Sequence, residues 1–195
     1  MKTITAAMIL ALGSIAAAQT PIPDCKLKAA QAPALRGIRL GMNVDQALGV
    51  FPGANANEHL RDRLSNPRFG VVTIMILPGQ YGSKDKFVGV RSVDLGFLDG
   101  ELNFFSFMYN GPSWDSAEQF ASSVAESLKL PGIESWRQNF GGQTLKCEGF
   151  QISVQTATEN SGNTIQIKNL DTDVDKIVHG REEAIKDASR RAFKP

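Results

Sequence analysis

The chain has 195 residues, with 21 Lys or Arg against 20 Asp or Glu, so its formal net charge is +1. A nearly neutral chain has little electrostatic attraction to nucleic acid or to anionic lipid, and we expect neither as a partner. The length suits one domain built around one hydrophobic core.

The first 18 residues have the features of a secretory signal peptide. Lys2 precedes an uncharged apolar run over residues 4–15, and Ala16 and Ala18 complete an A-x-A cleavage site. The run is too short to span a bilayer. Asp24 precedes Cys25, whereas a lipidated cysteine follows a small residue. We therefore expect cleavage near Ala18 and a periplasmic or secreted protein without a membrane anchor.

Cys25 and Cys147 are the chain's two cysteines. Export favours a disulfide between them, and the alternative is one reactive and one buried thiol. A bridge would close a loop of about 120 residues and fasten an extended N-terminal arm, residues 19–34, to the body. The chain-entropy estimate for such a loop is about 4–5 kcal/mol.

Residues 35–195 are expected to form one α+β domain. Asn43 and Gln46 have capping-box spacing, and the apolar positions 44, 47, 48 and 51 share one helical face, so a short helix is predicted there. Residues 54–70 are polar and are expected to form a loop. Strands are predicted over residues 71–77, 90–98 and 101–109. Asp99 and Gly100 between the last two are typical of a type I′ hairpin turn.

The second half of the chain has a similar plan. Ser116 and Gln119 again have capping-box spacing, before an apolar helical stripe that ends at Leu128. Strands are predicted around residues 145–147, 150–154 and 164–170, and a charged helix over residues 181–193. The predicted fold is an antiparallel sheet with short amphipathic helices on one face. Residues 35–110 and 111–170 are candidates for two tandem halves.

No catalytic motif is present in the sequence. The chain has two histidines, His59 and His179, no G-x-S-x-G motif, and no cysteine and histidine set with zinc spacing. We therefore expect a protein that is not an enzyme and that needs no cofactor. A hydrolase that uses paired carboxylates is the least favoured alternative.

One acidic segment has a calcium-loop pattern. Asp171, Asp173, Asp175 and Glu182 match its first, third, fifth and twelfth positions. Lys176 occupies the sixth position, where the loop requires glycine, and its charge would repel calcium. An acidic strand exit that leads into a helix N-terminus is the favoured interpretation, and calcium remains the alternative.

The strand over residues 101–109 is apolar on both sides. Phe105, Phe107 and Tyr109 are expected on one face, and Leu102, Phe104 and Met108 on the other. Helices cover one face of a sheet, so the arm, the C-terminal helix or a partner must cover the second. Because aromatic side chains are efficient anchors, Phe105, Phe107 and Tyr109 are the predicted contacts for another envelope or extracellular protein. A small apolar ligand held between sheet and helices is the alternative.

The stretch LGMNVDQALGVFPG resembles the G-M-T-x-x-x-V-x-x-x-x-G signature of exported domains of the β-lactamase-inhibitor-protein-like group, which includes the small lipoprotein of the outer-membrane assembly machine. Gly41 and Met42 match, Asn43 replaces Thr, Ala47 replaces Val, and Gly53 follows Pro52. The resemblance implies a short helical element on an antiparallel sheet and a non-catalytic, protein-binding module that sometimes uses the sheet's free face. The chain lacks the lipobox of the lipoprotein.

Overall fold

A computed structural model describes residues 24–82, 85–158 and 161–193. The predicted signal peptide lies outside these ranges. The strands are β1 (Val71–Ile76), β2 (Val90–Leu98), β3 (Glu101–Tyr109), β4 (Arg137–Asn139), β5 (Gly142–Lys146), β6 (Phe150–Gln155) and β7 (Asn163–Asn169).

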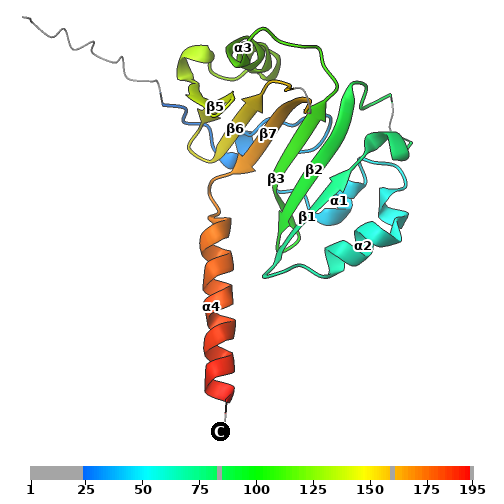
Figure 1. The fold of residues 1–195 in the computed structure, drawn as a ribbon, viewed down its shortest axis with the longest axis vertical. Helices are drawn as coiled ribbons and strands as arrows, with labels where there is room; N and C mark the ends of the chain where they lie inside the picture. The colour runs from blue at the N-terminus through cyan, green and yellow to red at the C-terminus, as the bar shows by residue number, and fades with distance from the viewer. Residues whose placement is uncertain (1–23, 83–84, 159–160, 194–195) are drawn as a thin grey trace, which may run out of the picture.

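These strands form one antiparallel sheet with the order β1-β2-β3-β7-β6-β5-β4 (Figure 1). Strands β1–β3 and β4–β7 are two meanders, and their last strands, β3 and β7, pair at the centre. The predicted α+β fold is confirmed, and the two candidate halves contribute the two ends of one sheet. The hairpin turn is also confirmed, because Asp99 and Gly100 both have positive φ angles, 51° and 84°.

The α-helices are α1 (Val44–Leu48), α2 (Glu58–Ser65), α3 (Ala117–Leu128) and α4 (Val174–Ala192). The predicted capping box of α1 is present: the backbone N–H groups of Gln46 and Asn43 donate to each other's side chains at 2.9 and 3.0 Å. Ser116 caps α3 by accepting from the Gln119 N–H at 3.1 Å.

Helix α2 corrects the prediction of a loop over residues 54–70. The Asn57 side chain caps it by accepting from the Leu60 N–H at 3.1 Å, and Leu60 and Leu64 pack against the core. Two leucines among charged residues give a weak apolar stripe, so the polar composition of this segment concealed the helix.

Helix α4 begins at Val174, before the predicted helix over residues 181–193. The Asp173 side chain caps it by accepting from the Lys176 N–H at 3.0 Å. Asp175 and Glu182 then lie about 10 Å apart along one helix axis, so the calcium-loop pattern does not form a loop that wraps around an ion. The acidic residues Asp173 and Asp175 instead lie at the N-terminus of a helix, as the favoured interpretation predicted.

Helix α4 projects away from the sheet (Figure 1), and the Arg181 side chain attaches its N-terminal half to the sheet. Arg181 donates to the Phe69 carbonyl at 2.7 Å and forms a two-pronged ion pair with Asp99 at 2.8 and 2.6 Å. Gly70 has a φ of 82°, and a Cβ there would lie 2.0 Å from the Arg181 guanidinium. The glycine therefore makes room for this contact.

The predicted disulfide between Cys25 and Cys147 is present, with the two Cα atoms 4.4 Å apart. It fastens the arm alongside the end of β5, where the Gly149 N–H also donates to the Leu27 carbonyl at 3.0 Å. The bridge is compatible with an exported protein.

One face of the sheet, which we call the covered face, forms the core. Its central row crosses six strands, and every member has 0% exposure: Leu145, Ile152, Ile167, Phe105, Leu95 and Ile74. Buried residues of α1 and α3, among them Leu48 and Phe120, belong to the same core cluster. Side chains alternate along a strand, so the residues between these positions point to the opposite face.

The structure corrects the expectation that Phe105, Phe107 and Tyr109 contact a partner. Phe105 and Phe107 are fully buried on the covered face, and Tyr109 is half-buried. Phe107 lies 6.1 Å from the Phe87 ring, which in turn stacks on Phe51 after α1 at 4.8 Å. The chain's own α1 region therefore fills the position assigned to a partner.

A register shift in β3 also changes the second face. Phe97 pairs with Leu102 and Gly96 pairs with Phe104, which leaves Asn103 as an extra residue. Leu102 is thereby buried with the core, so only Phe104 and Met108 remain from the predicted apolar set on the opposite face. The Phe104 ring lies over Gly96, where a Cβ would come within 1.9 Å of the ring.

Neighbouring phenylalanines therefore give a matched test of the two faces. Phe105→Ala should lower the free energy of unfolding by about 3–5 kcal/mol, because it leaves a cavity in the core. Phe104→Ala should cost only about 1 kcal/mol, because the ring is half-exposed. Urea unfolding of both variants measures the difference, and equal losses would contradict the assignment of the faces.

Candidate functional site

The second face of the sheet, which we call the open face, is the largest candidate surface. Its middle row crosses all seven strands: Arg137, Thr144, Ser153, Gln166, Ser106, Asp94 and Met75. The next row contains Lys146, Gln151, Lys168, Phe104, Gly96 and Thr73. Six spacings between neighbouring strands give the face a width of about 30 Å.

No helix crosses the open face in the described part of the chain. Helix α4 touches one margin, where Val174 and Asp175 line a hollow of about 290 Å³ together with Phe104 and Lys168. Met75 is 58% exposed and Gln166 is exposed, whereas Ser106 between Gln166 and Asp94 in the same row is buried.

Hydroxyl and amide groups dominate the open face over β5, β6 and β7. The Thr144 and Ser153 hydroxyls lie 3.1 Å apart, and the Gln151 amide donates to Ser153 at 3.1 Å. Such groups both donate and accept hydrogen bonds, so they suit a polar, hydrogen-bonding contact. Phe104 and Met108 on β3 and Met75 on β1 supply apolar contact area.

Asp94 is the acidic residue in the middle row. Met75 and Ser106 flank it on the neighbouring strands, and it has neither an ion pair nor a hydrogen bond from its side chain in the described structure. Partial burial raises the pKa of this carboxyl above its ordinary value. A half-buried carboxylate without a partner is costly, and a cation from outside would relieve that cost.

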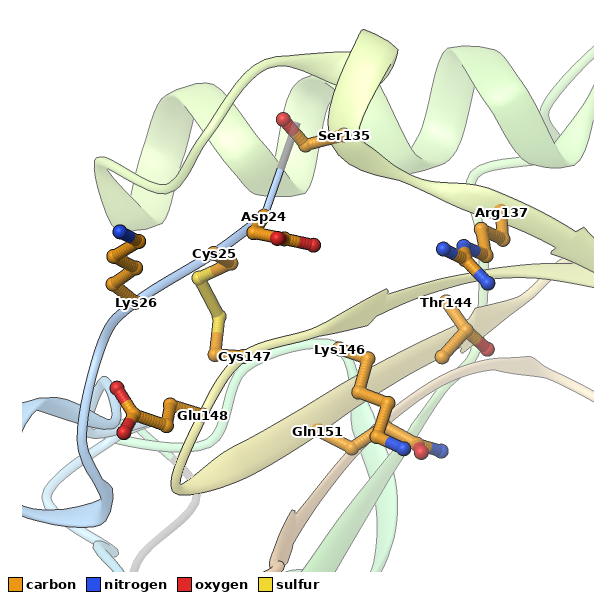
Figure 2. A pocket seen from close by; sticks show the side chains of 10 residues that line it. All are labelled: Asp24, Cys25, Lys26, Ser135, Arg137, Thr144, Lys146, Cys147, Glu148 and Gln151. Atoms are coloured by element: carbon orange, nitrogen blue, oxygen red, sulfur yellow. A yellow bond between two sulfur atoms is a disulfide. The ribbon is translucent and has the colours of Figure 1, made fainter. Parts of the chain in front are cut away.

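The opposite end of the open face is basic. A hollow of about 680 Å³ lies there, and Figure 2 shows its lining side chains beside the disulfide. Lys26, Arg137 and Lys146 line it, with Asp24 pointing toward Arg137. Glu148 also lines it but forms an ion pair with Lys28. Within the described residues, Lys26, Arg137 and Lys146 outnumber Asp24 as unpaired charges at this end of the face, Lys168 lies near its centre, and Asp94 lies toward the other end.

The chain's two histidines lie on helices and not on the strands of this face, with His59 on α2 and His179 on α4. The residues of the open face were not predicted as a group. Its rows combine residues from seven strands, and the register between those strands cannot be derived from the sequence. The alternation of Gln151, Ser153 and Gln155 with apolar residues was the signal that marked part of it.

No family model matches the chain, and no match was found among curated proteins or solved structures. The resemblance of residues 41–53 to β-lactamase-inhibitor-protein-like domains therefore stays a prediction. Within the described ranges, no helix has both the length and the apolar character needed to cross a membrane.

Two carboxylates should affect stability in opposite directions. The native pKa of Asp94 is raised, so this group contributes stability at low pH and loses it as pH rises through that pKa. The native pKa of Asp99 is lowered by its hydrogen bond to Arg181, so its contribution is present at neutral pH and is lost as pH falls.

Urea midpoints across roughly pH 3 to pH 8 test this difference. At neutral pH, Asp94→Asn should raise the midpoint and Asp99→Asn should lower it. Asn tolerates the left-handed turn conformation at position 99, so the second variant reports mainly the lost ion pair. A neutral-pH midpoint that falls with Asp94→Asn would mean that the Asp94 carboxylate already has a partner within the chain.

Proposed function

We propose that this protein is an exported, non-catalytic module that binds another envelope or extracellular protein on its open face. The observation that carries the proposal is a seven-stranded sheet in which the described helices pack against one face and none of them crosses the other. A helix-free face about 30 Å wide has the dimensions of a typical protein–protein interface.

The charges of the open face define the partner's chemistry. A Lys or Arg side chain of the partner would pair with Asp94. Met75 and Met108 beside Asp94 would contact apolar groups around that partner cation. Carboxylates of the partner would pair with Lys146 and Arg137 at the other end of the face. A partner with a basic and an acidic site separated by several strands would match both ends at once.

Export is the second part of the proposal. It rests on the N-terminal sequence pattern and on the disulfide, which persists in oxidising compartments and is rare in the cytosol. In such a compartment the bridge holds Asp24 and Lys26 at the basic end of the open face, so the same bond supports the proposed surface.

The experiment begins with cross-linking of the tagged mature chain in the envelope fraction of the source cells and identification of the captured protein by mass spectrometry. The captured protein is then purified and titrated against variants. Gln166→Arg at the centre of the open face should abolish binding. Asp94→Asn should weaken it about tenfold or more, because a charge-assisted contact is lost.

Ser122→Arg provides the matched control, because Ser122 is an exposed residue of α3, which packs against the covered face. It should leave binding unchanged. Binding that Ser122→Arg disrupts and Gln166→Arg spares would contradict the proposal. So would a correctly folded chain that captures no saturable protein partner.

A further inference from the structure

A third hollow lies between α3 and the sheet, apart from the open face. Its volume is about 310 Å³, and we call it the α3 groove. Its apolar wall includes Tyr109, Trp114, Phe120 and Leu128. The rings of Trp114 and Phe120 stack with their centroids 5.3 Å apart. Ligand pockets begin at about this volume, so the groove suits a small molecule.

Packing and hydrogen bonds fix the groove before any ligand enters. Buried Asn163 donates to the Pro112 carbonyl and accepts from the Ala157 N–H at 2.9 Å. It thereby holds the loop after β3 against the start of β7. A preformed site loses less conformational entropy on binding than one that must be ordered.

Arg36 is the one charged residue among those that line the α3 groove. It lies beside the Tyr109 side chain at the rim, and it has no ion pair in the described part of the chain. Burial raises the pKa of the Tyr109 phenol against the opposing effect of Arg36, so the phenol stays protonated at neutral pH and can donate a hydrogen bond.

The backbone at Arg36 is strained. Arg36 and Gly37 have φ angles of 52° and 93°, and Leu35 and Ile38 exchange two backbone hydrogen bonds of 2.9 Å across them. A two-residue turn with both φ angles positive favours Asn, Asp or Gly at its first position. The turn holds Arg36 at the edge of an apolar groove, where its positive charge can meet the negative charge of a bound molecule.

We infer that the α3 groove binds a small apolar carboxylate, with its apolar body against Trp114 and Phe120 and its carboxylate at Arg36 and Tyr109. Among the described residues that line it, the groove has one cation, one phenol donor and no acidic side chain, which suits a ligand with a single negative charge. This ligand site is independent of the proposed protein-binding face, because none of its lining residues belongs to the rows of the open face.

Octanoate is the probe, and octanol of the same chain length is its neutral control. Calorimetric titration of the full mature chain should show one octanoate per molecule, bound about tenfold or more tightly than octanol. Trp114 emission gives a second readout in Trp136→Phe, because Trp136 is buried elsewhere with its indole N–H donating to the Pro131 carbonyl at 3.1 Å.

Arg36→Asn separates a binding role from a structural one. Asn relieves the strained turn, so the variant should unfold at a higher urea concentration than the wild type while its octanoate affinity falls about tenfold or more. Its octanol affinity should be unchanged. Arg36→Lys keeps the charge and should retain most of the octanoate affinity.

Ser123→Phe should block the groove for both probes, whereas Ser122→Phe on the exposed side of α3 should not. Equal binding of octanoate and octanol, or an Arg36→Asn variant with full octanoate affinity, would overturn the assignment of a carboxylate site. The absence of saturable octanoate binding by the folded wild-type chain would overturn the site itself, whatever the partner-binding experiment shows.

Discussion

The pairing of β3 with β7 is the contact on which the rest of the structure depends. These strands end two separate meanders, and their six paired positions run from Phe104 with Lys168 to Tyr109 with Asn163. The pairing closes the chain over more than fifty residues, so its entropy cost must be offset by the core that it completes. Without it the chain would form two small sheets with extra exposed edges; with it, rows of side chains continue across seven strands.

Both candidate sites follow from that continuous sheet. On the covered face, the rows through Phe105 and Ile167 are sealed by α1 and α3 and supply the apolar burial that stabilises the fold. On the open face, Asp94 keeps an unpaired, half-buried charge that this burial has to offset. Tyr109 and Asn163, the last pair of β3 and β7, also line the α3 groove, so the central pairing positions that site too. Core packing and the proposed protein-binding surface are thus assigned to different faces of one sheet, and the α3 groove lies on the covered side.

Local signals predicted much of this fold, and long-range packing explains what they missed. Local sequence patterns were enough to predict the capping box of Asn43, the Ser116 cap and the Asp99–Gly100 turn, because each depends only on residues close together in the chain. Neighbouring residues do not determine which face is covered, because residues 101–109 are apolar on both sides. The extra residue at Asn103 also moves Leu102 from one face to the other. Helix α2 owes its position to two leucines and a cap, too weak a pattern to predict. The α3 groove unites segments that are over a hundred residues apart, such as Arg36 and Asn163, which only tertiary structure brings together.

The division of the sheet into a covered and an open face is tested most directly by solvent accessibility at labelled methyl groups. Met75 and Met108 lie on the open face, whereas Ile152 and Ile167 lie in the central row of the covered face. NMR spectra of the mature chain would be recorded with and without a soluble gadolinium chelate. We expect strong broadening of the Met75 and Met108 methyl signals and unchanged signals from the two isoleucines. Methionine methyls as protected as those of Ile167 would show that the chain covers both faces, and the proposed binding surface would not exist.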